Sequence, residues 1–251
     1  MTRTGKLALF AGVALCGGTA YAQQFVVNQA DIPSGNPNNN SRSENVDFGD
    51  IDLDGDWDAI FADGGDGGND QNRLWLNRGP GLLGVFIDRT NAQVPAITDQ
   101  SRDAEFVDFD NDGDIDLYIS NTSQISNQTN RWWTNSGVGS GVYVDETAAR
   151  WVNIGVNDGV TTFSSVSNSA VLADGFIDWS CDCDFGDLDN DGDLDLFHST
   201  YGGSFTGQVP SRIFLNDGAG FFEEFNPSGY QLTGSSMPTG APAIWAAGVF
   251  T

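Results

Sequence analysis

Short runs of aliphatic and aromatic residues alternate along the chain with polar segments rich in Asp, Asn and Gly. Three of these runs, AIFAD, LYIS and LFHST, directly follow an aspartate-rich segment. They are too short for helices, lack helix-capping residues, and contain the β-branched and aromatic residues that favour strands. Each is therefore predicted to be a β-strand that is entered from a polar loop.

Other runs recur at similar places around these three. RLWLN (73–77), RWWTN (131–135) and RIFLN (212–216) lie downstream, and each leads through a glycine-containing turn into GVFIDRT, GVYVDET or GFFEEFN. Upstream, VDFGD, FVDFD and CDFGD supply one more short strand per unit. A unit of about four short strands that recurs after 58 residues and again after 79 predicts an all-β fold of about three β-propeller-like blades.

The aspartate-rich segments share the pattern D-x-D-x-D-G-D-x-D at residues 50–58, 108–116 and 187–195. Two carboxylates about 4 Å apart repel by roughly 1 kcal/mol in water, so five in one loop require a compensating cation. Oxygen ligands at positions 1, 3 and 5, a glycine at the bend at position 6 and a carbonyl at position 7 suit calcium better than magnesium. Softer metals would call for His or Cys, and these loops contain neither.

Calcium sites of the helix-loop-helix type open with the same pattern and are the first alternative. They require a Glu at position 12, where this chain has Phe61, Ile119 and His198. Position 9 instead carries an aspartate that can complete the coordination shell three residues earlier. These aspartates are Asp58, Asp116 and Asp195. The sequence therefore predicts a cation in a loop that enters a strand.

The repeats resemble the FG-GAP or VCBS-type repeats of bacterial exported proteins, which are related to the calcium-binding blades of the integrin α-subunit β-propeller. The resemblance covers roughly residues 46–226; Phe48-Gly49 and Phe185-Gly186 keep the "FG", whereas the second repeat has Phe106-Val107. It implies about three calcium ions, with backbone carbonyl ligands from Asp56, Asp114 and Asp193. The side-chain ligands that it implies are Asp50, Asp52, Asp54 and Asp58; Asp108, Asp110, Asp112 and Asp116; and Asp187, Asp189, Asp191 and Asp195.

The N-terminus has the layout of a cleavable secretory signal over residues 1–22, with Arg3 and Lys6 before an apolar stretch and Ala20-Tyr21-Ala22 at its end. We therefore expect export to the periplasm, the cell surface or the medium, without membrane insertion after cleavage. Removing these residues lowers the net charge from −25 to −27 and leaves no lysine. Such acidity argues against nucleic acid and anionic membranes as partners.

The expected organisation is an N-terminal arm at 23–45 followed by a repeat domain at 46–251. Its repeats are expected at about 46–103, 104–182 and 183–240, with the excess length of the second in the insert at 153–175 and the start of a fourth at 241–251. Three repeats and one starting strand do not close a propeller ring, which needs four to eight blades. We expect either a piece of a longer protein or an open array whose exposed blade edges favour self-association.

Several conspicuous residues leave alternatives open. Cys181 and Cys183 could form a disulfide or remain free thiols, although bridging residues two apart in a strand is geometrically difficult. His198 is expected to be a half-buried strand residue rather than a ligand or a base. Packing between blades is expected for the tryptophans, with a sugar-binding site as the alternative, and these are Trp132, Trp133, Trp151, Trp179 and Trp245.

Catalytic motifs are lacking in the sequence. It has no Gly-x-Ser-x-Gly elbow, no phosphate-binding glycine loop and a single histidine. The first hypothesis is a non-enzymatic, calcium-stabilised module for binding or adhesion, with an unknown protein or glycan as its ligand. The second is the propeller domain of a calcium-dependent polysaccharide lyase or hydrolase.

Overall fold

The computed structural model describes most of the three expected repeats, and all statements below concern the described residues. Residues 1–30, which include the expected signal, and residues 234–251, which include the expected start of a fourth repeat, lie outside them, as do Trp179, Trp245 and nearly all of the insert. The described ranges are 31–33, 41–79, 81–82, 84–122, 129–152, 154–155, 165–166, 180–200, 210–224 and 232–233.

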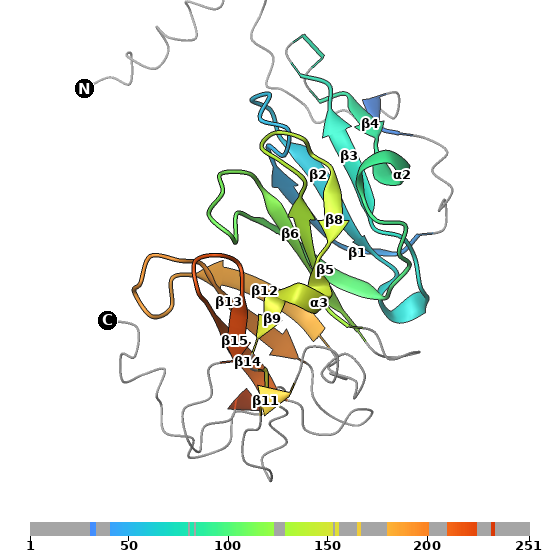
Figure 1. Ribbon diagram of the computed structural model, residues 1–251. Helices are drawn as coiled ribbons and strands as arrows, with labels where there is room; N and C mark the ends of the chain where they lie inside the picture. Colours follow the sequence, from blue (N-terminus) through green and yellow to red (C-terminus); the bar gives the residue numbers. More distant parts are fainter. Residues whose placement is uncertain are drawn as a thin grey trace, which may run out of the picture.

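Three antiparallel sheets follow one another along the chain, and in each the strands pair in sequence order (Figure 1). Blade 1 consists of β1 (Ser43–Gly49), β2 (Asp58–Asp63), β3 (Arg73–Asn77) and β4 (Phe86–Asp88). Blade 2 consists of β5 (Ser101–Val107), β6 (Asp116–Asn121), β7 (Arg131–Asn135) and β8 (Tyr143–Asp145). Blade 3 consists of β12 (Ser180–Gly186), β13 (Asp195–Thr200), β14 (Pro210–Asn216) and β15 (Phe222–Glu224).

Blade 3 is extended by short strands. β9 (Trp151–Val152), from the segment that follows blade 2, pairs in parallel with β15, and β16 (Leu232–Thr233) pairs with β14. β10 (Ile154–Gly155) and β11 (Ser165–Val166) form a separate two-stranded sheet. The predicted all-β fold of open, propeller-like blades is confirmed, because the three sheets do not close into a ring within the described residues.

The described helices are single turns. α2 (Thr90–Gln93) follows β4, α3 (Thr147–Arg150) follows β8, and a 3-10 turn, η2 (Gly65–Gly67), follows β2. Among the residues that the structure describes, no helix has the length and apolar character needed to cross a bilayer. The helices therefore serve as connections at the rim of the blades.

The blades are close copies of one another in strand register. The last residue of the first strand pairs with the first residue of the second in every blade, as Gly49 with Asp58 in blade 1. A register shift near the start of the first strand also recurs, between Ser43 and Asn45 in blade 1 and at the matching residues in the other blades. Such bulges re-aim the backbone, so each first strand is bent in the same way. Position-by-position comparison between blades is therefore justified.

Side chains from facing blades form two hydrophobic cores. The first core lies between blades 1 and 2 and includes Ile51, Ile60 and Trp133. The second lies between blades 2 and 3, where the rings of Trp132 and Phe222 stack with centroids 4.0 Å apart. Burying a large side chain contributes roughly 1.5–3 kcal/mol, so these interfaces, and not the separate sheets, hold the fold together. Trp132, Trp133 and Trp151 thus pack between blades, as expected.

Candidate cation sites in the aspartate loops

Each aspartate loop joins the first strand of a blade to the second. Residues 50–57 connect β1 to β2, 108–115 connect β5 to β6, and 187–194 connect β12 to β13. The three loops project from the same side of the array in Figure 1. The predicted entry of each loop into a strand is confirmed, because β2, β6 and β13 begin at the ninth loop position.

In every loop the carboxylates at positions 1, 3 and 9 converge. In each set, one oxygen atom from every residue lies within 4.8 Å of the corresponding oxygens of the other two. The same three positions meet in three separate loops, so the convergence is a property of the repeat. The sets are Asp50, Asp52 and Asp58; Asp108, Asp110 and Asp116; and Asp187, Asp189 and Asp195.

Position 5 lies outside these sets of three. The carboxylate of Asp54 accepts a hydrogen bond of 3.2 Å from the backbone N–H of Asp56, at position 7. Asp112 accepts from the N–H of Asp114, at 3.1 Å, in the second loop. The matching bond in the third loop joins Asp191 to the N–H of Asp193, also at 3.1 Å. Position 5 therefore braces the bend of the loop but lies outside the converging set.

The loop backbone turns sharply at positions 4 and 6. The position-6 glycine has a positive φ in all three loops, for example 95° at Gly55, and its N–H donates to the position-1 carboxylate of Asp50 at 3.1 Å. Only glycine adopts such angles without steric cost. Position 4 also has a positive φ, 59° at Leu53 and at Asn111 and 66° at Asn190. Asn tolerates this left-handed region, whereas Leu does so at a cost.

The position-9 aspartate is fully buried and held by backbone donors. Asp58 accepts from the N–H of Asn77 at 2.9 Å and from that of Ile51 at 3.2 Å. Asp195 has the same pair of donors, Asn216 at 2.9 Å and Leu188 at 2.8 Å. The bond at position 9 thus ties the aspartate loop to the last residue of the third strand.

The asparagine that ends the third strand is a site residue that the sequence analysis did not single out. Asn135 donates its side-chain amide to the carbonyl oxygen of Ile115 in its own loop, at 3.3 Å, and to that of Ile51 in the preceding loop, at 3.2 Å. Asn216 repeats both bonds, to Leu194 at 3.1 Å and Phe109 at 2.7 Å. The recurring Asn at the end of RLWLN, RWWTN and RIFLN was the available signal.

The electrostatics of the loops disfavour ionised carboxylates without a cation. Burial, together with repulsion from the neighbouring loop carboxylates of Asp110 and Asp114, raises the pKa of the Asp116 carboxyl to about 8. Burial likewise raises the pKa of Asp58 to about 7. A bound divalent cation would favour the ionised forms, so cation and protons compete for the same oxygens.

Unpartnered oxygen atoms mark the positions that fit a cation. Asp50 Oδ1, Asp52 Oδ1 and Asp116 Oδ2 are buried and accept no hydrogen bond from the described protein atoms. A buried ionised oxygen without a partner is costly, whereas as a metal ligand it is satisfied. The loops thus fit a hard cation by geometry and by chemistry. Both carboxylate oxygens of Asp56 and of Asp114 are also buried without a partner, although the resemblance implied only their carbonyls.

Loop 2 has a neighbouring positive charge. The Arg150 guanidinium, from α3, donates to Asp110 at 3.1 Å and to Glu146 at 2.6 Å. It also donates to the carbonyl oxygen of Ala219 in blade 3, at 2.9 Å. Arg150 therefore compensates part of the charge of loop 2 and links that loop to the next blade.

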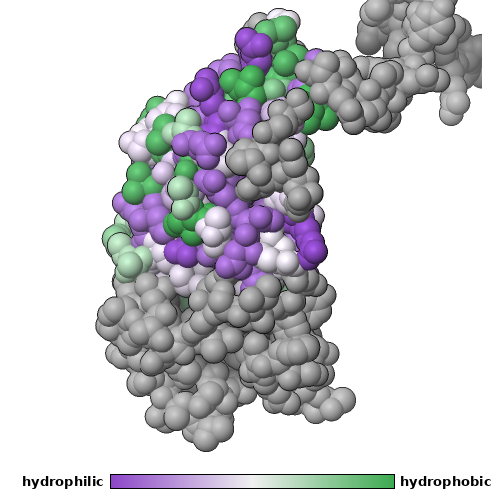
Figure 2. All heavy atoms as spheres, turned by 90° about the vertical axis from the view of Figure 1, so that its right-hand side faces the viewer, coloured by the Kyte–Doolittle hydropathy of each residue, from purple (hydrophilic) through white to green (hydrophobic). Residues whose placement is uncertain are grey.

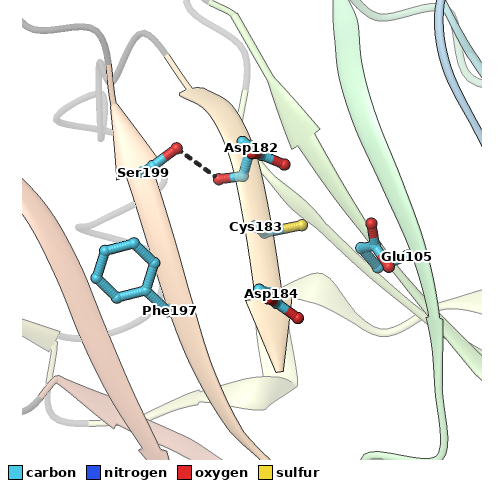
Figure 3. A pocket seen from close by; sticks show the side chains of 6 residues that line it. All are labelled: Glu105, Asp182, Cys183, Asp184, Phe197 and Ser199. Carbon is cyan, nitrogen blue, oxygen red and sulfur yellow. Dashed lines mark hydrogen bonds between the residues drawn. The ribbon is translucent and has the colours of Figure 1, made fainter. Parts of the chain in front are cut away.

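A cavity of about 390 Å³ lies beside β12 and is lined by Glu105, Asp182, Cys183, Asp184, Phe197 and Ser199 (Figure 3). The Cys183 thiol donates to Asp103 Oδ2 at 3.1 Å, and burial raises the pKa of this thiol well above its usual range. A neutral thiol is a poor nucleophile and a poor metal ligand. Neither Cys181 nor Cys183 is in a disulfide, so the structure has thiols at this place.

His198 is fully buried, more than the half-burial expected from the sequence. Its Nδ1 lies 3.2 Å from the hydroxyl oxygen of Tyr118 and its Nε2 lies 3.4 Å from the side-chain nitrogen of Asn130. Both contacts are with blade 2. His198 therefore contributes to packing between blades 2 and 3, away from the aspartate loops.

Comparison with known families agrees with the repeat architecture. Residues 50–119 match the family model described as FG-GAP-like repeat, a stretch that runs from the first aspartate of loop 1 into β6. The chain therefore contains an FG-GAP-type repeat, as the resemblance implied. No curated protein matches the chain.

Proposed function

We propose that this chain is an exported calcium-binding repeat protein that acts as a binding or adhesion module. The observation that carries the proposal is the convergence of positions 1, 3 and 9 in all three loops. Carboxylate oxygens are the ligands that calcium takes, and its flexible coordination accommodates an irregular set of them. The proposed side-chain ligands are those three positions, with position 5 and the position-7 carbonyl completing the shell.

Export fits this proposal, because extracellular modules bind calcium with dissociation constants of about 0.1–1 mM. At ten times that concentration each site would add roughly 1.4 kcal/mol of stability, and three independent sites would add about 4 kcal/mol. Calcium would then set the rigidity of the blades. Their outer surfaces and connecting segments would provide contacts to a protein or glycan ligand, as loops on a rigid scaffold commonly do.

Calcium titration of the purified chain tests the first part of the proposal. We expect about three bound calcium ions by calorimetry and a melting temperature that rises with calcium. Magnesium at the same concentration should stabilise less, since it retains its waters and needs near-octahedral geometry. An unchanged melting temperature between excess chelator and millimolar calcium would refute calcium binding.

A glycan array and a protein pull-down, each with calcium and with chelator, test the second part. Calcium-dependent capture of a ligand without its breakdown supports a binding module. Release of reducing ends from acidic or neutral polysaccharides would instead identify the chain as part of a lyase or hydrolase.

A further inference from the structure

Blade 1 exposes a face whose counterparts in blades 2 and 3 are buried. Phe106 and Phe185 each lie two residues before the first aspartate of a loop, and each packs into the core shared with the preceding blade. Phe48 occupies the same position in blade 1 and is 47% exposed. No blade precedes blade 1 among the described residues. The exposure of Phe48 therefore follows from the position of its blade in the array.

The eighth loop position shows the same contrast. Ile115 packs into the first core and Leu194 into the second, each against the preceding blade. Trp57 is the counterpart in blade 1 and is 66% exposed. The exposed and half-exposed side chains on this side of blade 1 are hereafter the blade 1 face, namely Val46, Phe48, Trp57, Phe61, Trp75 and Phe86.

The aromatic side chains of the blade 1 face contact one another, as aromatic side chains do in the interfaces between blades. The rings of Phe61 and Trp75 lie 4.5 Å apart, and Phe86 continues the row at 6.5 Å from Trp75. The Arg73 guanidinium packs over Phe61 and Trp75, at 5.1 and 5.6 Å from the ring centroids. In blade 2 the counterparts of Trp75 and Phe86 are Trp133 and Tyr143, and both are buried in the first core. A contiguous aromatic face of this kind marks an interaction site.

Hydrogen bonds between the first strands of neighbouring blades indicate which groups a partner of the blade 1 face should carry. The N–H of Phe106 donates to Asp47 of the preceding blade at 2.8 Å, and the N–H of Cys183 donates to Asp103 of the preceding blade at 2.9 Å. Each interface therefore combines aromatic packing with a carboxylate that reaches the free edge of the next first strand. In blade 1 the N–H of Phe48 already donates to Asp47 of its own blade, at 2.7 Å. The partner of the blade 1 face should therefore present apolar side chains and a carboxylate for the N–H of Val46, the counterpart of the Cys183 N–H.

The far side of blade 3 presents this combination. Asp182 is the counterpart of Asp103, Asp184 is the counterpart of Asp47, and both are exposed. Leu188 and Phe197 are half-exposed, and their counterparts in blade 1 are the core residues Ile51 and Ile60, which receive blade 2. The two ends of the array are therefore complementary.

Figure 2 shows green apolar residues interspersed with purple polar ones on the side of the array where blade 1 lies.

We propose that the blade 1 face docks on the far side of blade 3 of a second copy of this chain. Both interfaces within the chain have this composition, so the contact continues an established interface. Two copies related by a two-fold axis would each contribute one end to the other, in a head-to-tail arrangement that closes. The three blades that the structure describes in each copy make six, within the range in which propeller rings close.

Sedimentation velocity of the full chain in calcium, over a range of concentrations, tests the proposal. We expect a species of twice the chain mass. Phe48→Asp should raise the dissociation constant about 100-fold, equivalent to about 2.8 kcal/mol, because it places a charge where an aromatic anchor is needed. Val144→Asp is the matched control, since Val144 is 48% exposed on β8, outside both proposed contact faces, and this variant should dimerise as the wild type does.

A mixture of two variants separates loss of docking from loss of folding. Phe197→Asp alters the other side of the contact and should also give monomers. Mixed in equal amounts, Phe48→Asp and Phe197→Asp retain one intact contact per pair and should recover a dimer that neither forms alone. Recovery would show that both variants are folded and that the two faces meet.

Three results would overturn the proposal. A dimer that persists in Phe48→Asp would place the contact elsewhere. If the wild type is a monomer and the thiol of a Phe48→Cys variant reacts rapidly with a maleimide, the blade 1 face is open and has no partner. If the wild type is a monomer and the thiol of the variant is protected, other residues of the same chain cover the blade 1 face.

Discussion

The side-chain amide of Asn216 donates a hydrogen bond of 2.7 Å to the carbonyl oxygen of Phe109, a residue of the aspartate loop one blade earlier. Its second bond reaches Leu194 in its own loop, and the N–H of the same residue holds Asp195. One residue therefore joins two neighbouring loops to each other. The proposed cation sites are coupled through such contacts to the interfaces between blades.

Replacing this asparagine should cost more in blade 2 than in blade 1. Asn135→Ala leaves the buried carbonyl oxygens of Ile51 and Ile115 without a donor, and we expect a loss of about 2–3 kcal/mol in the free energy of unfolding. Asn77→Ala is the matched control, because the Asn77 amide donates to Trp57 in its own loop, at 3.3 Å, and accepts from the N–H groups of Arg78 and Gly84 in its own blade. Urea denaturation of both variants measures the difference, and equal losses would contradict a link between blades.

Leu53 is the position-4 residue that does not suit its backbone angle. A left-handed conformation costs a residue with a Cβ roughly 1–2 kcal/mol, and Asn tolerates it better than Leu. Leu53→Asn should therefore raise the free energy of unfolding by about 0.5–1 kcal/mol, seen as a melting temperature higher by about 2 °C. The reverse change, Asn111→Leu, should destabilise, because Asn111 also donates to Asp193 at 3.0 Å. A neutral or harmful Leu53→Asn would argue against strain at this position.

Positions 9 and 5 should differ in their effects on calcium. Asp116→Asn removes a carboxylate from the converging set of loop 2, so its affinity should fall more than tenfold, or about 1.4 kcal/mol. In chelator the same variant should be more stable than the wild type, because burial raises the pKa of Asp116 to about 8 and makes its ionised form unfavourable. Asp112→Asn, outside the set, should weaken calcium less.

Calorimetry with calcium and melting curves in chelator measure these two effects. The opposite signs of the Asp116→Asn effects distinguish loss of a ligand from general damage to the loop. A larger loss of affinity in Asp112→Asn than in Asp116→Asn would mean that position 5, and not position 9, dominates binding.

The Glu105 carboxyl, which lies outside the aspartate loops, should make the free energy of unfolding depend on pH. Burial raises the pKa of its carboxyl to about 8, and Asp103, Asp47 and Asp184 add repulsion. The folded state then keeps a proton that the unfolded state loses near the ordinary value of 4.5, so stability should fall as the pH rises from about 4.5 to about 8. Glu105→Gln should match the wild type below pH 4.5 and exceed it increasingly up to pH 8.

Thermal melts across this range, in constant calcium, provide the measurement. Glu223→Gln is a suitable control, because Glu223 is exposed on β15. If Glu105→Gln gives the same change at pH 4 and at pH 8, the carboxyl does not titrate as proposed.

Much of the fold could be predicted because its signals are local. RWWTN coincides with β7 at 131–135, and the predicted strand LYIS lies within β6, which begins one residue earlier, at Asp116. Alternating apolar residues and glycine-containing turns are sufficient for that. The recurrence of four short strands already indicated blades, and the resemblance to FG-GAP-type repeats agreed with it.

The remaining site features depend on contacts that the local pattern does not contain. The bond from Asn135 to Ile51 spans 84 residues, and Asn111 reaches Gly218 across 107 residues. Asp54 lies outside the converging set, although all the aspartates look alike in the pattern and both Asp50 and Asp54 accept backbone hydrogen bonds within the loop. Likewise, Phe48 and Phe106 occupy the same sequence position, and only the order of the blades makes one exposed and the other half-buried.

The parallel pairing of β9 with β15 has a consequence for biosynthesis. Trp151 belongs to the segment that follows blade 2, but its ladder partner, Phe222, is translated about 70 residues later. At about 5–20 residues per second, the nascent chain would present β9 unpaired for roughly 4–14 s. Blade 2 therefore leaves the ribosome with an aromatic strand that is not yet covered, and this interval is when the chain would most need protection by a chaperone.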